Sequence, residues 1–136
     1  MKKIVLLLAL MAVLAGCASM APRAESADKQ RIYEADYDML FNAAKAVLLE
    51  NECKITLASK DSGILQAEKI LMSRIFAEMF APGAGAIYKC YDLTFLPGSQ
   101  TTIYLENYVH YKDGSGSDSG RQDEYLRFWM QLEEKL

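Results

Sequence analysis

Two long segments rich in aromatic and β-branched residues constrain the fold of this chain most strongly. They span residues 86–96 and 101–111, and the turn-forming sequence Pro-Gly-Ser-Gln at residues 97–100 joins them. Aromatic and β-branched composition favours strands, and a short turn-forming connection favours antiparallel pairing. The domain is therefore predicted to be built around a long antiparallel hairpin.

Alternation along this hairpin sorts its side chains onto two faces. One face is predicted to be apolar and to carry Tyr91, Leu93, Phe95, Ile103, Leu105 and Val109. The opposite face is predicted to carry Tyr88, Tyr104, Tyr108 and His110. A tyrosine-rich face suits contact with a protein or a glycan, because tyrosine offers apolar area with a polar end. The alternative is that a helix or solvent covers this face.

Helices are predicted near both ends of the domain. Residues 36–51 have apolar side chains at intervals of three and four, with Asp36 placed to cap the helix. In the last segment, Ser119 and Gln122 have the spacing of a capping box. The apolar stripe of this last helix is Tyr125, Trp129, Leu132 and Leu136.

Shorter strands are predicted at residues 30–33, 53–57 and 64–69, with a turn at residues 60–63 and a solvated loop at residues 112–120. Strands followed by a terminal helix imply an α+β fold. We expect an antiparallel sheet of about four to five strands, with the N-terminal and C-terminal helices packed on one face.

Residues 70–80 interrupt this pattern with a strongly apolar stretch. As a short amphipathic helix, the stretch would place Leu71, Met72, Ile75, Phe76 and Met79 on one side. Together with Phe80 they are candidate partner-binding residues, as are the tyrosines at positions 88, 104 and 108. Two interpretations remain open: the stretch fills the core, or it contacts a partner or the membrane.

The N-terminus has the features of a lipoprotein signal peptide. Two lysines precede an apolar run at residues 4–13, which is too short to span a bilayer, and the sequence Leu-Ala-Gly-Cys ends at Cys17. This box resembles that of bacterial lipoproteins, and the resemblance implies lipidation of Cys17 and cleavage before it. We expect a signal peptide at 1–16, a lipidated cysteine and flexible tether at 17–29, and a single domain at 30–136. Because Ala18 is not the aspartate of inner-membrane retention signals, the expected location is the periplasmic side of the outer membrane.

Composition narrows the classes of partner. Lys2 and Lys3 leave with the signal peptide, so the mature chain has 13 basic and 18 acidic side chains and a net charge near −5. Nucleic-acid binding requires a basic surface, so no nucleic-acid partner is expected.

The local pattern resembles the helix-grip domain of the BamC group of outer-membrane lipoproteins. The resemblance rests on the helical segment 37–48, the strand 53–57 and the sequence Lys-Asp-Ser-Gly-Ile-Leu-Gln-Ala at residues 60–67. It implies a helix-grip fold. Members of that group have two such domains behind a long extended segment, whereas this chain has one domain, so the group's role in barrel assembly does not follow.

Residues suited to catalysis are sparse. His110 is the single histidine and has no partners at metal-ligand spacing, so no metal site and no cofactor are expected. Glu106 and His110 share a strand face, but no nucleophile accompanies them. Cys53 and Cys90 are predicted to point to different faces of the sheet, which opposes a disulfide.

These observations favour a non-enzymatic protein. We expect a lipid-anchored periplasmic subunit that binds another envelope protein, with membrane attachment through Cys17. A module that binds a small ligand or glycan is the alternative, because a sheet gripped by helices can enclose an apolar cavity.

Overall fold

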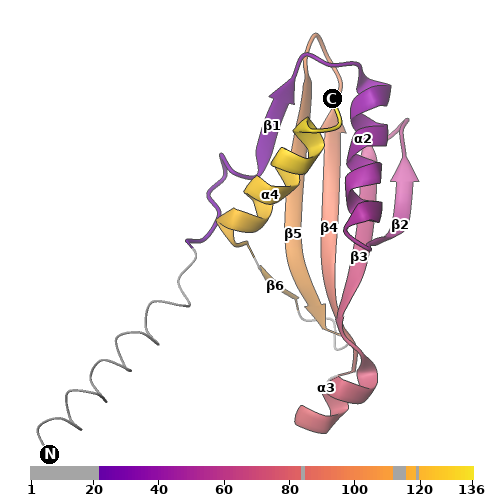
Figure 1. Cartoon of the computed structure of the whole chain (residues 1–136), viewed down its shortest axis with the longest axis vertical. Helices are drawn as coiled ribbons and strands as arrows, with labels where there is room; N and C mark the ends of the chain where they lie inside the picture. The colour runs from indigo at the N-terminus through magenta and orange to yellow at the C-terminus, as the bar shows by residue number, and fades with distance from the viewer. Residues whose placement is uncertain (1–21, 84, 112–115, 119) are drawn as a thin grey trace, which may run out of the picture.

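The computed structural model describes residues 22–83, 85–111, 116–118 and 120–136 (Figure 1). Its elements are β1 (Gln30–Tyr33), α2 (Tyr37–Glu50), β2 (Lys54–Ser59), β3 (Ile64–Met72), α3 (Arg74–Phe80), β4 (Ile87–Leu96), β5 (Thr101–Tyr111), β6 (Gly116–Asp118) and α4 (Gln122–Glu133).

The strands form one antiparallel sheet in the order β1-β5-β4-β3-β2. The short strand β6 pairs with Tyr108, Val109 and His110 of β5, so it continues the edge that β1 begins at the other end of that strand. The two helices α2 and α4 lie side by side on one face of the sheet (Figure 1). The predicted α+β fold, with its antiparallel sheet and two helices on one face, is confirmed.

The core lies between the sheet and these two helices. Leu93 of β4 pairs with Leu65 of β3 and with Leu105 of β5, and all three side chains are fully buried. The helices cover them with Leu40, Phe41, Ala44, Val47, Leu48, Tyr125, Phe128, Trp129 and Leu132. Burying each large apolar side chain contributes roughly 1.5–3 kcal/mol, so this layer holds the helices on the sheet.

The two helix starts differ in how well the sequence predicts them. Asp36 caps α2, since its Oδ1 accepts a hydrogen bond from the Met39 amide at 3.1 Å, as expected. At α4 the N-cap residue is Arg121, which makes no side-chain capping bond, so the predicted capping box is wrong. Ser119 lies outside the described residues. Leu136, expected in the apolar stripe of this helix, is exposed.

Residues 22–29, which the sequence suggested were part of a flexible tether, pack against the domain. The Ala24 amide donates to the Gly120 carbonyl, and the Gln122 amide donates to the Pro22 carbonyl at 3.0 Å. The Trp129 indole Nε1 donates to the Asp28 carbonyl at 2.7 Å. The domain therefore begins by Pro22, eight residues before β1.

Two further boundaries differ from expectation. Strand β3 continues to Met72, so Ile70, Leu71 and Met72 end a strand instead of beginning a helix. The segment predicted as a solvated loop contains β6, while residues 112–115 and 119 lie outside the described part. Both changes lengthen the sheet at the end that carries α3 (Figure 1).

Candidate functional site

The first candidate surface is the stretch of residues 70–80, which we call the apolar tip. It comprises the end of β3 and the helix α3, and Figure 1 shows it at one end of the molecule, beyond the helices that cover the sheet. The side chains of Ile75, Phe76, Met79 and Phe80 are between 60% and 79% exposed. Leu71 and Met72 are exposed as well, so the interpretation in which this stretch fills the core is wrong.

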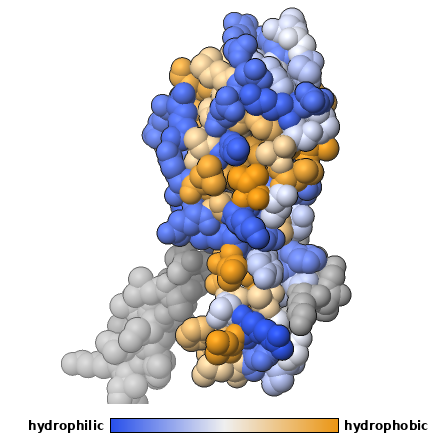
Figure 2. All heavy atoms as spheres, turned by 90° about the vertical axis from the view of Figure 1, so that its right-hand side faces the viewer, coloured by the Kyte–Doolittle hydropathy of each residue, from blue (hydrophilic) through white to orange (hydrophobic). Residues whose placement is uncertain are grey.

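Local features of the chain explain why the apolar tip lies outside the helix-covered part of the sheet. The pairing of β3 with β4 shifts register between Ile70 and Met72, where the strand ends. After α3, Gly83 adopts a φ of +89°, a conformation that glycine tolerates and that turns the chain back toward β4. Within α3 the buried side chain is Ala77. In the space-filling view, apolar side chains gather on the lobe that the tip forms (Figure 2).

The second candidate surface is the open face of the sheet, opposite α2 and α4. The predicted separation of faces is confirmed: Phe95 and Ile103 are buried under the helices, while Tyr104 is 41% exposed on the other side. Tyr104 and Tyr108 are four residues apart on β5, roughly 13 Å. Tyr88 pairs with His110 near the apolar tip. The three tyrosines thus follow the length of the open face and do not form one cluster.

Tyr108 is held in place on this face. Its hydroxyl donates to Asp92 Oδ2 at 3.2 Å. Burial, followed by the nearby Asp92 carboxylate, raises the pKa of Tyr108 to about 12. The hydroxyl therefore stays protonated and acts as a hydrogen-bond donor throughout the neutral range.

An exposed apolar group surrounds Tyr104. Ile32 of β1 and Leu96 of β4 both pair with Thr102 of β5, on the same face as Tyr104, and all three of the large side chains are between 41% and 58% exposed. We call Ile32, Leu96 and Tyr104 the outer patch. Neither Ile32 nor Leu96 was predicted from the sequence as a binding residue, although Leu96 alternates in phase with Tyr88 and could have been placed on this face.

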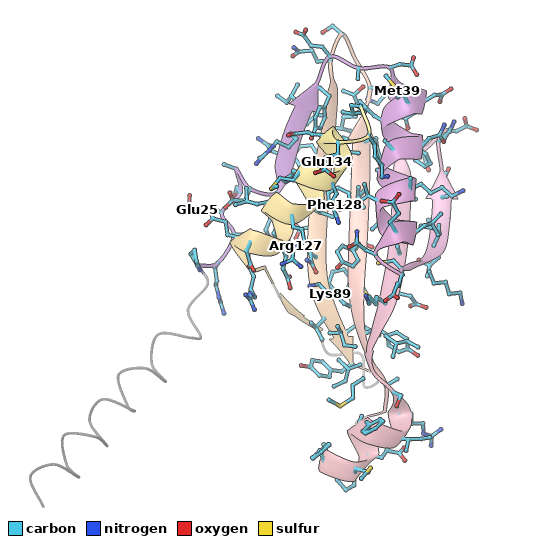
Figure 3. The ribbon with its side chains drawn as sticks, viewed as in Figure 1. Glu25, Met39, Lys89, Arg127, Phe128 and Glu134 are labelled. Carbon is cyan, nitrogen blue, oxygen red and sulfur yellow. The ribbon has the colours of Figure 1, made fainter. Side chains whose placement is uncertain are left out.

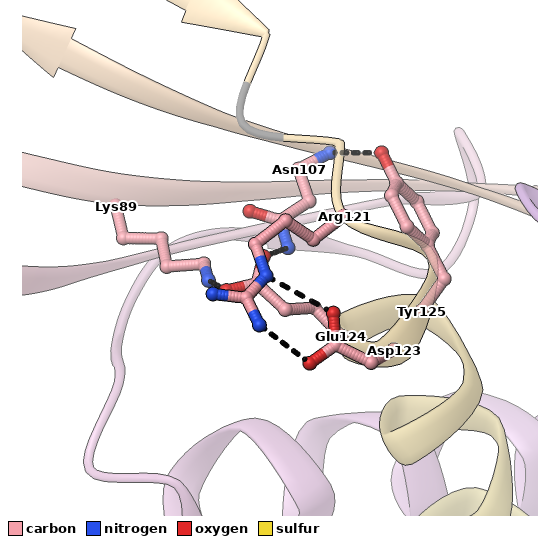
Figure 4. Close-up of polar contacts among 6 residues, drawn as sticks. All are labelled: Lys89, Asn107, Arg121, Asp123, Glu124 and Tyr125. Atoms are coloured by element: carbon pink, nitrogen blue, oxygen red, sulfur yellow. Dashed lines mark hydrogen bonds and ion pairs between the residues drawn. The ribbon is translucent and has the colours of Figure 1, made fainter. Parts of the chain in front are cut away.

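A polar cluster lies on the helix-covered face (Figure 4). Lys89 Nζ contacts Glu124 Oε1 at 2.5 Å, and Asn107 Nδ2 donates to Glu124 Oε2 at 3.1 Å. The Asn107 amide donates to the Tyr125 hydroxyl at 3.0 Å. This cluster was not predicted, and its signal in the sequence is that Lys89 and Asn107 interrupt the apolar alternation of β4 and β5. Its charges balance within the cluster, which anchors the start of α4 to the sheet.

A small cleft adjoins this cluster between α2, α4 and β4. It has a volume of about 80 Å³, and its lining includes Lys89, Tyr91, Arg127 and Phe128, three of which are labelled in Figure 3. Ligand sites usually measure about 300–1,000 Å³, so this cleft is too small for an organic ligand. Burial raises the pKa of Tyr91 to about 12, so the phenol stays neutral beside the core.

A larger hollow of about 390 Å³ lies at the sheet edge where β2 begins, lined by Glu52, Lys54, Glu68, Lys69, Ile70 and Tyr88. Glu52 follows the end of α2 with a φ of +61°, the left-handed conformation usual for glycine at this position. Its carboxylate contacts Lys69 Nζ at 3.1 Å, and the same Nζ donates to the Asn51 carbonyl at 3.0 Å. The hollow thus combines paired charges with one aromatic wall.

Glu106 and His110, which share a strand face, do not form a catalytic group with each other. Glu106 pairs with Lys29 at 3.1 Å, and His110 is exposed on the same face. In the described part of the chain, no three His, Cys, Asp or Glu side chains are grouped so that they could hold a metal ion.

The two cysteines of the domain are free, as the predicted separation implied. Cys53 is buried in the core, whereas Cys90 pairs with Glu68 and Tyr108 on the open face. Burial raises the pKa of both thiols. Neither is positioned to reach the other across the sheet.

Membrane-related features fall partly outside the described residues. Cys17 and the predicted signal peptide at residues 1–16 lie outside the described residues. Among the helices of the described ranges, none is long and apolar enough to cross a bilayer.

Comparison with known proteins gives a fold-level likeness. The chain matches no family model and no curated protein. Among solved structures, it is similar to a DUF4468 family protein from Bacteroides ovatus, with a TM-score of 0.47 and 11% sequence identity over 83% of this chain and 89% of that chain. At this identity the likeness concerns the fold alone.

Proposed function

We propose that the protein is a lipid-anchored, non-enzymatic subunit on the periplasmic side of the outer membrane, and that it binds another envelope protein through the open face of its sheet. The observation that carries this proposal is the outer patch. Its three large side chains are exposed on the face that α2 and α4 leave open. The signal sequence ending at Cys17 supports the membrane location.

The chemistry of the open face suits a protein partner. An apolar centre with a polar rim is typical of protein interfaces, and tyrosine is enriched there. Around the outer patch lie Thr94, Thr102 and the Lys29–Glu106 ion pair, which supply such a rim. The antiparallel sheet behind the patch holds these side chains in fixed positions, so binding requires little ordering.

A non-enzymatic role is supported by how the titratable side chains are used. Glu106 forms an ion pair with Lys29. Glu124 forms an ion pair with Lys89 and accepts a hydrogen bond from the Asn107 side chain. These contacts connect elements of the fold to one another.

Site-specific photo-crosslinking in intact cells tests the proposal. A photoreactive residue at Leu96 should capture one envelope protein repeatedly, whereas the same residue at Met130, which is exposed on α4, should not. Ile32→Asp should abolish the product without lowering the thermal midpoint by more than a few degrees. Equal capture from both positions, or none from Leu96, would contradict binding through the open face.

The hollow at the start of β2 favours a second candidate function, the binding of a small polar ligand or glycan. Its volume of about 390 Å³ falls in the usual range for ligand sites, and Tyr88 offers an aromatic surface beside four charged side chains. Native mass spectrometry of the protein purified from its own envelope should then show a bound small molecule that Tyr88→Ala loses. A spectrum with the polypeptide alone would count against this function.

A further inference from the structure

We propose that the apolar tip inserts into the head-group region of the same membrane that holds the lipid anchor. This inference rests on the proposed lipidation of Cys17. It assigns a lipid surface as the occupant of residues 70–80 and fixes the orientation in which the domain stands on the membrane.

The tip is apolar, prominent and outside the core. Phe76 and Phe80 are 60% and 79% exposed, and α3 places them beyond the ends of the paired strands (Figures 1 and 2). Aromatic and aliphatic side chains of this kind partition favourably into the boundary between head groups and acyl chains. With seven residues, α3 is too short to span the bilayer. Its exposed apolar side chains therefore suit the membrane interface.

The point at which the chain enters the domain places the anchor near this end. The Pro22 carbonyl accepts a hydrogen bond from the Gln122 amide at the start of α4, four residues after Asp118, and Asp118 of β6 pairs with Tyr108 of β5. From Tyr108 the strand runs about 10 Å to its tip-side end at Tyr111 and about 23 Å to its other end at Thr101.

The anchor has limited reach from that point. Five residue steps separate Cys17 from Pro22, and an extended chain covers at most about 17 Å over that length. The anchored cysteine therefore stays within about 17 Å of the start of α4, to which Pro22 is hydrogen-bonded. Because β1 then runs away from the tip, the chain enters the fold from the tip side. An anchor that is short and attached on this side favours contact between the apolar tip and the bilayer.

The charges on the tip indicate which lipids it fits. Arg74 Nε and Glu78 Oε1 form an ion pair at 2.8 Å, so the charged side chains of α3 neutralise each other. No attraction to anionic lipids is needed, and the acidic mature chain would not provide it. Insertion should accordingly occur in zwitterionic phosphatidylcholine and depend little on salt.

Fluorescence quenching by brominated lipid tests the proposal with a matched pair of variants. Full-length mature protein, lipidated at Cys17, would be reconstituted into phosphatidylcholine vesicles with brominated acyl chains. Phe80→Trp reports on the tip, and Leu96→Trp reports on an exposed site at the opposite end of the sheet. Trp129 is buried and gives the same background in both variants. Phe80→Trp emission should fall at least twofold relative to vesicles without bromine, whereas Leu96→Trp emission should change by less than a tenth.

Several outcomes would overturn the insertion. Equal quenching of both tryptophans, or quenching of neither, contradicts it. A shift of Phe80→Trp emission that depends on protein concentration without vesicles would show that a second copy covers the tip instead. Intact mass analysis of the same sample separates these failures from failure of the proposed anchor: acyl groups on Cys17 with an unquenched tip refute the insertion alone. Phe76→Ser and Phe80→Ser should reduce quenching of a tryptophan at Ile75 without changing the thermal midpoint, because these side chains lie outside the core.

Discussion

Gly63→Ala is expected to destabilise the domain by about 3–6 kcal/mol. Gly63 adopts a φ of +68° in the turn between β2 and β3, where a side chain costs about 1–2 kcal/mol. A Cβ at this position would lie 2.3 Å from the Phe95 carbonyl oxygen, which is backbone and cannot rotate away.

The contact with Phe95 adds the larger part of this cost. The Phe95 amide donates to the Gly63 carbonyl at 2.7 Å, and its ring is buried against Phe41 with ring centroids 5.1 Å apart. Moving the turn away weakens a hydrogen bond worth about 1 kcal/mol and disturbs the packing of a core ring, for which crowding costs about 1–3 kcal/mol.

Urea unfolding followed by Trp129 fluorescence measures the effect, because Trp129 is buried in the native state. The control is Gly83→Ala. Gly83 has a φ of +89°, and among the described residues beyond its chain neighbours no atom lies within 4 Å of the position that a Cβ would take. The control should lose about 1–2 kcal/mol from backbone strain alone. If Gly63→Ala lies within about 1 kcal/mol of this control, the assigned clash with Phe95 is incorrect.

Three further predictions concern the polar groups. Glu52→Gly should be about 1 kcal/mol more stable than Glu52→Ala in urea unfolding. Both variants remove the ion pair with Lys69, but only glycine relieves the strain of the left-handed backbone at position 52. Equal stabilities of the two variants would refute this strain. Lys89→Met should cost about 1–3 kcal/mol, because it leaves the partly buried Glu124 carboxylate without its cation. Adding Glu124→Gln should recover part of the loss, and additive losses would contradict the pairing. Because burial raises the pKa of Tyr91 from 10.0 to about 12, the free energy of unfolding should fall between pH 10 and pH 12; Tyr91→Phe should reduce that slope, and an unchanged slope would contradict the burial.

Local patterns were sufficient to predict most of the fold. Asp36 caps α2, and the strands of the long hairpin fall within one residue of their predicted ends. These elements are specified by capping chemistry and by alternation, which act over a few residues. The burial of one hairpin face followed from the same alternation.

Elements that depend on distant contacts were not predicted. Residues 70–72 carry an apolar run that fits either a helix or a strand, and pairing with β4 decides for the strand. Residues 22–29 show no apolar periodicity, yet the hydrogen bond from Trp129 to the Asp28 carbonyl fixes them on α4. Position 119 suited a cap by spacing alone, but the chain enters α4 through Arg121.

Some residues of the candidate site could be predicted from the sequence, and others could not. The tyrosines of the open face could be placed by alternation, whereas Ile32 and Leu96 join Tyr104 through pairing with the residue between them on β5. The exposure of the apolar tip could not be read from its sequence, since a core segment has the same composition. Only the three-dimensional arrangement shows that α2 and α4 leave it uncovered.

Because residues 22–29 pack against the domain, the chain between Cys17 and the domain is shorter than the sequence predicted. Four residues, 18–21, remain between Cys17 and the domain, so with Cys17 lipidated as proposed the bilayer would lie within about 17 Å of Pro22. If the apolar tip is directed at the membrane as proposed, the outer patch at the other end of the sheet would face the periplasm and be accessible to a partner.

The lipid anchor underlies both proposals, and the intact mass of the mature protein extracted from its own membranes tests it most directly. The predicted species is a polypeptide that begins at Cys17 and carries a diacylglyceryl group on the thiol together with an acyl group on the new amino terminus. Cys17→Ser should remain uncleaved at its full mass. A mature polypeptide that begins at another residue, or that begins at Cys17 without acyl groups, would contradict the account.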